Sequence, residues 1–152
     1  MTLITSDNNR SVEIGQAAIL HSLYSTVVAR IKDVNELAPA AVSFLKTGRY
    51  SGKEGLKVAR QLNLIRDRLS QIPPEAAVYD INNPATSAPW EGHLSAVITS
   101  CGNMYTTADG KDLLFELVGI LTFVGYSKLP LRWHKDDIKV CITTRDTDMS
   151  SH

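Results

Sequence analysis

The chain has 152 residues, with 16 lysines and arginines against 16 aspartates and glutamates, so its formal net charge at pH 7 is zero. This length fits one domain, and 43% hydrophobic with 21% charged residues excludes a disordered chain. The zero balance excludes a protein that coats nucleic acid by bulk charge. Without a run of about 20 apolar residues for a membrane span or a signal-peptide pattern at the start, we expect a cytoplasmic protein.

The first third of the chain predicts a short strand followed by a helix. Residues 11–15 alternate polar and apolar side chains, as a half-buried strand does. From residue 17 the apolar positions change to a helical spacing and form one stripe: Leu20, Leu23, Tyr24, Val27, Val28 and Ile31. This spacing predicts a helix over residues 16–32 whose stripe faces a core. The polar residues before position 10 predict a short strand or coil.

Two further helices are predicted next. The proline that opens residues 39–48 suits the first turn of a helix, because its missing N–H is unpaired there, and the closing glycine is a common helix stop. The following helix, residues 52–71, has Ser51 as candidate N-cap and Glu54 as the partner in a capping box. Pro73-Pro74 ends it, since a proline disfavours helical backbone in the residue before it.

The second half of the chain combines short β-prone runs with one long helix. An irregular loop over residues 82–92 carries Trp90, a large aromatic residue that can fix such a loop in place. After a turn at Asp109-Gly110, residues 111–125 predict a helix whose apolar side chains cover most of its circumference, so it should be central. The β-prone runs are residues 76–81, 94–100 (a strand or a short helix), 104–107, 131–133 and 138–143.

This order of elements indicates the α+β class, because helices and short strands follow one another without a regular βαβ alternation. We predict three to four helices packed on a small, mostly antiparallel sheet, in a single domain of residues 1–144. The polar residues 145–152 are expected to form a flexible C-terminal tail.

Metal and cofactor sites are not indicated. No histidine lies three or four residues from another histidine or from a cysteine, which is the usual spacing of zinc ligands, and the glycine-rich phosphate-binding motifs are missing. His134, Asp136 and Asp137 are better explained by a solvated turn. We therefore expect no cofactor and no metal.

One catalytic alternative is a small cysteine-dependent hydrolase. Cys101 would be the nucleophile, His93 or His21 the base, and Asp80 the group that orients the base. This reading requires the side chains to meet in a cleft. The two cysteines of the chain are more simply explained as reduced, buried thiols.

The zero net charge hides two oppositely charged stretches. Residues 46–68 hold seven basic and two acidic residues, a net charge of +5, and residues 75–116 hold one basic and six acidic residues, a net charge of −5. Lys53, Lys57 and Arg60 share one helix face, so a nucleic-acid-binding module that uses the basic helix 53–68 is a second alternative. The same helix needs a solvated face opposite its apolar stripe, which explains these charges without nucleic acid.

Several short motifs occur in an order that resembles one protein family. They are HSLYSTV (residues 21–27), FLKTGRY (44–50), IPP (72–74), VYDI (78–81), APW (88–90) and YTTADGKDL (105–113). In this order the chain resembles immunity protein family 70 of bacterial polymorphic-toxin systems. The resemblance covers residues 14–121, and the part after residue 125 contributes nothing to it.

The resemblance implies a small cytosolic protein that binds the C-terminal domain of a toxin, as in contact-dependent growth inhibition, and blocks it without being an enzyme. It implies no catalytic or cofactor residues, and the oligomeric state stays open. Many such toxins are nucleases with basic clefts, so an acidic patch would steer association. We expect the toxin-facing surface to contain Asp80, Trp90, Glu91, Tyr105, Asp109, Asp112 and Glu116. Alternatively, the acids are turn and helix-start residues without a partner.

Overall fold

Four long helices and one antiparallel sheet make up the computed structural model, which describes residues 1–5, 9–50, 53–134 and 141–143. Within these residues, the long helices are α1 (Ala17–Arg30), α3 (Pro39–Thr47), α4 (Gly55–Leu69) and α6 (Leu113–Ser127). The shorter helical turns are α2 (Val34–Leu37), the 3-10 turn η1 (Pro74–Ala76) and α5 (Cys101–Met104). The predicted α+β class is confirmed.

The sheet joins the two ends of the described chain. Its strand order is β2-β1-β3-β4, and every neighbouring pair is antiparallel. The strands are β1 (Thr2–Thr5), β2 (Ser11–Glu13), β3 (Leu131–His134) and β4 (Cys141–Thr143). Leu3 of β1 pairs with Val12 on one side and with Trp133 on the other, and all three side chains are buried. This row of cross-strand neighbours therefore forms the face of the sheet that packs on the helices.

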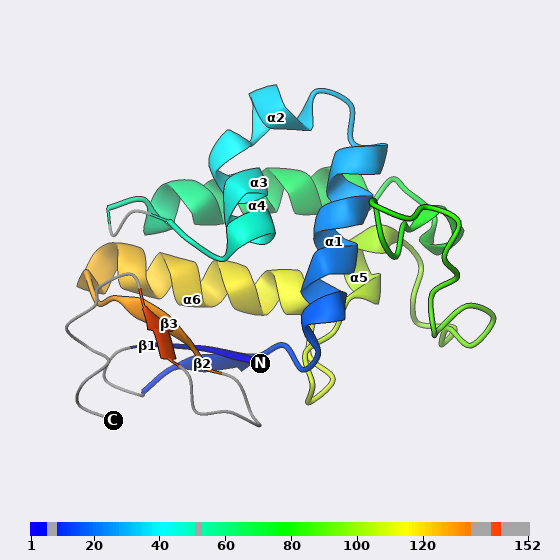
Figure 1. The fold of residues 1–152 in the computed structure, drawn as a ribbon. Coiled ribbons are helices and arrows are strands. Elements are labelled where there is room, and N and C mark those ends of the chain that lie inside the picture. Colours follow the sequence, from blue (N-terminus) through cyan, green and yellow to red (C-terminus); the bar gives the residue numbers. More distant parts are fainter. Residues whose placement is uncertain (6–8, 51–52, 135–140, 144–152) are drawn as a thin grey trace.

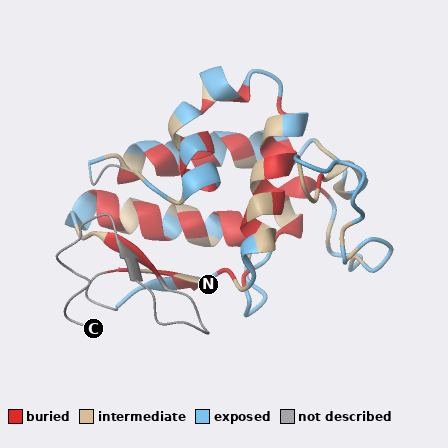
Figure 2. Ribbon diagram, viewed as in Figure 1, coloured by how far each residue is buried: buried red, intermediate tan, exposed pale blue. Residues whose placement is uncertain are grey.

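Helix α6 is the central layer, between α4 and the sheet (Figure 1). Buried positions recur along both helices (Figure 2), and the predicted central place of α6 is confirmed. The two helices come closest where two glycines meet. A Cβ atom on Gly55 would lie 2.8 Å from the carbonyl oxygen of Leu121, and one on Gly125 would lie 2.8 Å from the backbone nitrogen of Leu56. Only residues without a side chain allow this approach.

The end of α3 is attached to β3 through a tryptophan. The Trp133 indole N–H donates a hydrogen bond to the Gly48 carbonyl oxygen at 2.9 Å, and its ring stacks on Phe44 with centroids 6.5 Å apart. Gly48 has a φ of 73°, and a Cβ atom there would lie 2.6 Å from Trp133 Nε1. Gly48 is thus the predicted helix stop and also the point where the sheet meets α3.

The predicted helices lie close to their expected bounds, and the largest difference is at the start of α4. This helix begins at Gly55, and the residue before it, Glu54, makes no side-chain capping bond. The proposed cap Ser51, the turn residues Asp136 and Asp137, and the tail of residues 145–152 lie outside the described residues.

The strands predicted over residues 76–81 and 104–107 are wrong, and residues 94–100 form turns rather than a strand or helix. Cys101–Met104 form α5 instead, because Ser100 and Asn103 make a reciprocal capping box at its start. Beyond it, Thr106 keeps only an isolated bridge to Asp112.

Candidate functional site

The irregular segment after η1 is attached to α1 by side-chain hydroxyl groups. The Val78 N–H donates to Thr26 Oγ1 at 2.8 Å, and Ser22 Oγ donates to the Val78 carbonyl oxygen at 3.0 Å. The Ile81 N–H donates to Ser25 Oγ at 3.0 Å. The three hydroxyl-bearing residues are fully buried, and their bonds satisfy backbone groups that a neighbouring strand would otherwise pair. This is why residues 76–81 do not need a sheet.

Tyr105 lies in the interior beneath this segment. Its hydroxyl is 2.9 Å from Ser22 Oγ and 2.7 Å from Thr26 Oγ1, and the residue is only 4% exposed. Burial raises the pKa of the Tyr105 hydroxyl, because the charged form would lose its hydration. Its side chain therefore belongs to the core, and almost none of it is exposed.

Trp90 fixes the loop of residues 82–92 on this core. Its indole meets the rings of Tyr79 and Tyr105 edge to face, with centroids 5.5 Å and 6.1 Å apart. Such pairs stabilise beyond the area that they bury. Trp90 also separates two hollows, a groove on the Tyr79 side and an apolar pocket of about 220 Å³ that it shares with Thr106. The Trp90 side chain thus holds the loop in a fixed position, although the loop contains no helix or strand.

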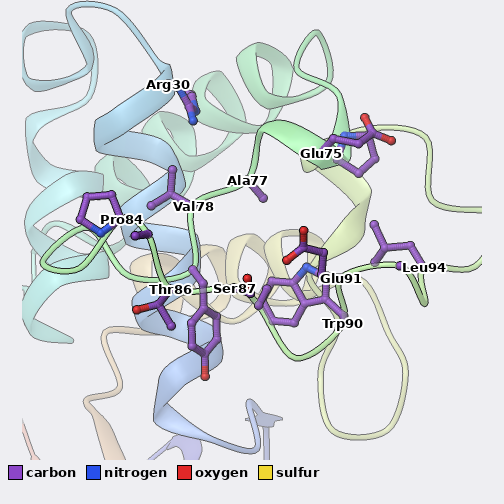
Figure 3. Close-up of a pocket in the computed structure, with 15 residues that line it drawn as sticks. Arg30, Glu75, Ala77, Val78, Pro84, Thr86, Ser87, Trp90, Glu91 and Leu94 are labelled. Carbon is purple, nitrogen blue, oxygen red and sulfur yellow. The ribbon is translucent and has the colours of Figure 1, made fainter.

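The groove has a volume of about 370 Å³ and runs between η1 with the residues after it and the loop that carries Trp90 (Figure 3). Its walls combine an aromatic side chain with charged ones. Arg30 lies at one end, where its Nε–H donates to the Ala76 carbonyl oxygen at 2.7 Å. Glu75 and Glu91 lie along the opposite side, with Glu91 next to the Trp90 indole. The groove therefore has two carboxylates and one guanidinium.

The other acids of the acidic stretch each have a basic side chain nearby. Their pairs are His21 Nε2 with Asp80 Oδ1 (2.9 Å), Arg66 with Asp112 (3.5 Å), and Lys111 with both Asp109 (3.5 Å) and Glu116 (3.7 Å). Within the described part of the chain, Glu75 and Glu91 have no such partner. The two acids that line the groove are therefore the ones that form no ion pair with another described residue.

Two of the paired carboxyl groups have lowered pKa values. The hydrogen bond from His21 lowers the pKa of Asp80, and the backbone N–H of Asn82 lowers it further. The Thr107 hydroxyl, which donates to Asp109, lowers the pKa of that carboxyl group. Asp112 accepts a bond from the Phe115 N–H as the N-cap of α6. These contacts are also what we expect if the acids are simply turn and helix-start residues, which is the alternative given by the sequence.

The structure brings only part of the expected surface together. Trp90 and Glu91 line the groove, and Asp109, Asp112 and Glu116 lie beyond the neighbouring pocket, around the start of α6. Glu75 was missing from the expected set although it counts in the acidic stretch. The sequence offered no signal for it, because only the fold shows which acids lack a cation and share a groove.

The side chains of the cysteine-hydrolase alternative do not form a nucleophilic site. Cys101 is fully buried, and its thiol donates to the Pro73 carbonyl oxygen at 3.3 Å. Burial raises its pKa to about 11, so the thiol stays protonated at neutral pH. His21 is bonded to Asp80 instead, and His93 is exposed on the loop. Among the described residues, no group of three or more potential ligands could hold a metal ion.

Some basic side chains of residues 46–68 point to solvent, and one of them contacts the acidic stretch. Lys53, Lys57 and Arg60 are exposed, as both the solvated-face and the nucleic-acid interpretations require. Arg66 lies six residues after Arg60 and faces α6. It pairs with Asp112 there, and its guanidinium lies 5.6 Å from the centre of the Phe115 ring. The two stretches therefore meet along the α4–α6 contact and partly neutralise each other.

Comparison with protein families shows to which family the chain belongs. The family model described as Immunity protein 70 matches residues 5–132. The chain belongs to this family. The match extends beyond the motif-bearing residues 14–121 and reaches from the end of β1 into β3. Searches of curated proteins and of solved structures gave no match.

The longest helices described, α4 and α6, have 15 residues each, and no described helix is long and apolar enough to span a bilayer.

Proposed function

We propose that this Immunity protein 70 family member binds a cognate bacterial toxin domain in the cytoplasm and neutralises it by covering its active or substrate-binding surface, without being an enzyme itself. Family membership supports an immunity role with a toxin partner. The buried thiol of Cys101, with a pKa raised to about 11, gives the catalytic alternative no nucleophile.

The surface that we propose for toxin contact is the groove beside Trp90. The observation that supports this choice is the pair of uncompensated carboxylates, Glu75 and Glu91, along one groove next to an indole ring. A partly exposed tryptophan in a hollow is a common centre of a protein interface. Carboxylates without an internal cation keep their full attraction for a basic partner surface.

The remaining acids are proposed to act over a longer range. Asp109, Asp112 and Glu116 are each next to a lysine or arginine, so their net field is weaker than their number suggests. Asp80 is hydrogen-bonded to His21. They would add to the steering of a basic toxin surface without being its direct ligands. A nuclease with a basic substrate-binding cleft is the class of toxin that fits this charge, and we propose it as the partner.

The test is charge reversal at the groove against charge reversal elsewhere. We expect Glu75→Lys with Glu91→Lys to lower the association rate with the toxin by at least ten-fold at low salt and to flatten its salt dependence. Trp90→Ala should instead raise the dissociation rate, because it removes a contact rather than a long-range charge. Both variants are measured by surface plasmon resonance and by rescue of cells that co-express the toxin.

A matched control reverses two exposed acids outside the groove, Glu13→Lys on β2 with Glu36→Lys on α2. This control changes the net charge equally and should keep most of the affinity. Equal loss in both double variants would show that only total charge matters. An unchanged rate in the groove variant would remove the groove from the toxin contact, while failure of the unmodified protein to bind any toxin would contradict the immunity role itself.

A further inference from the structure

Helix α6 leaves one apolar face uncovered although it is the central helix. Phe115 is 60% exposed and Tyr126 is 75% exposed, and both belong to the few large hydrophobic residues that the described part of the chain exposes. They lie eleven positions apart, which is close to three full helical turns, so they project from the same face. Two exposed aromatic rings on one helix face are more than the scattered apolar residues of an ordinary surface.

The positions between the two aromatic residues allow another helix to approach closely. Gly119 is exposed, and a Cβ atom there would have nothing within 4 Å. Thr122 Oγ1 donates to the Val118 carbonyl oxygen at 2.7 Å. Because this hydroxyl is already bonded within its own helix, covering Thr122 leaves no unpaired polar group. The face therefore has a large aromatic side chain at each end and only small side chains between them.

The order of these residues reads the same from either end. An aromatic, a small residue, a small residue and an aromatic occupy positions 115, 119, 122 and 126, with equal spacing on both sides of the centre. A two-fold dimer needs such a self-complementary patch, because each residue must meet the symmetry mate of another. We propose that a second copy of this chain docks on this face, with the two α6 helices antiparallel and Phe115 of each copy beside Tyr126 of the other.

The charges at the two ends of α6 favour the same arrangement. The acids Asp112 and Glu116 lie in or before the first turn, and the exposed Lys128 follows the last turn. Antiparallel docking places Lys128 of one copy near Asp112 of the other. It also sets the helix dipoles in opposite directions. Asp112 and Glu116 already pair with Arg66 and Lys111 of their own chain, which weakens this attraction. The symmetric order of the face and the opposed helix dipoles therefore favour the antiparallel dimer, and the end charges add to them.

This contact is narrow, since one helix face supplies its centre. It belongs to the low end of specific interfaces, and we expect a dissociation constant on the order of 10–100 µM. The groove beside Trp90 is formed by other residues, so the dimer does not depend on the proposed toxin contact.

Sedimentation velocity between about 1 µM and 500 µM tests the dimer. The unmodified chain should change from monomer to dimer over this range, and Phe115→Asp or Tyr126→Asp should raise the dissociation constant at least ten-fold. Val97→Asp is the control, because Val97 is 76% exposed but lies in another region. A chain that stays monomeric throughout, or a Val97→Asp variant that dissociates equally, overturns the proposal.

Disulfide formation tests the orientation. Phe115→Cys and Tyr126→Cys are made as separate variants in a Cys141→Ser background, in which the remaining native thiol, Cys101, is buried. Antiparallel docking brings positions 115 and 126 of different copies together, while identical positions stay about 16 Å apart along the axis. Only the mixture should then form a disulfide-linked dimer. Crosslinking of either variant alone indicates parallel docking, and crosslinking in no sample indicates that another molecule, such as the toxin, covers the face; both results overturn the proposal.

Discussion

Two parts of the molecule rest on the same core but are held in different ways. Helices α4 and α6 are held by apolar side chains and by the close approach of Gly55 to Gly125. The segment of residues 77–92 has no regular structure and is held by hydroxyl groups of α1 and by the Trp90 ring. The first arrangement is most sensitive to added volume, and the second is most sensitive to the loss of a hydrogen-bonding group.

The comparison teaches where a binding surface can be built. A loop whose backbone is bonded to buried hydroxyls can expose its charged side chains while its path stays fixed, because the bonds use backbone atoms and not those side chains. Glu91 lies in this segment, and Glu75 lies in η1 just before it. The helix pair supplies rigidity, and the irregular segment supplies the variable surface.

The largest effect is expected from added volume between the helices. Gly55→Ala should destabilise the protein by about 3 kcal/mol, because the new methyl group would overlap backbone atoms of α6 that cannot move separately. Gly119→Ala is the matched control, since its Cβ meets nothing, and it should be neutral or stabilise by about 0.5–1 kcal/mol. Urea unfolding at low micromolar concentration compares them. Equal effects of the two substitutions would show that the close approach does not limit packing.

A smaller effect is expected from removing one hydroxyl beneath the irregular segment. Thr26→Val keeps the shape but leaves the buried Val78 N–H without an acceptor, which should cost about 2 kcal/mol. Hydrogen exchange should show faster exchange in residues 77–81 than in α4 or α6. Thr122→Val, whose hydroxyl bonds only within its own helix, is the control and should change little. Uniformly faster exchange in all three regions would contradict a separately held segment.

The smallest effect is expected from the hydrogen bond between Asp80 and His21. Because the folded-state pKa of Asp80 is lowered, its contribution to stability is present above the ordinary value near 3.8 and is lost as the pH falls through the lower folded value. Asp80→Asn should therefore differ from the unmodified chain at pH 6 and converge with it in acid. Unfolding midpoints from pH 7 to pH 2.5 measure this, with Glu36→Gln as control. A difference that persists at the lowest pH would mean that the carboxylate charge is not its source.

The helices were predictable because their signals are local. The apolar spacing in α1 and the proline and glycine around α3 act within a few residues of one another, and α6 shows its central place by its composition alone. The segment after Pro74 was misread because Val78 and Ile81 have β-forming side chains, while the partners of their backbone are hydroxyls more than fifty positions earlier. Such long-range partners leave no periodic pattern in the sequence.

The candidate site was predictable in kind but not in detail. The excess of acids in residues 75–116 could be counted, and Trp90 could be recognised as a loop aromatic. Which acids remain uncompensated depends on where Arg66, Lys111 and His21 lie after folding. The burial of Tyr105 could not be predicted for the same reason, because a tyrosine after a helical turn gives no sign of two buried hydroxyls opposite its own.

The pairing of β1 with β3 has a consequence for the order of folding. Leu3 finds its partner Trp133 only after the whole helical layer has been synthesised, and closing so long a loop is entropically costly and slow. The helices can collapse on one another first, since their contacts are nearer in sequence, while β1 waits with β2 as a hairpin with one open edge. A chain truncated before residue 131 should therefore hold protected amides in α4, while the β1 amides that bond to β3 in the folded protein stay unprotected.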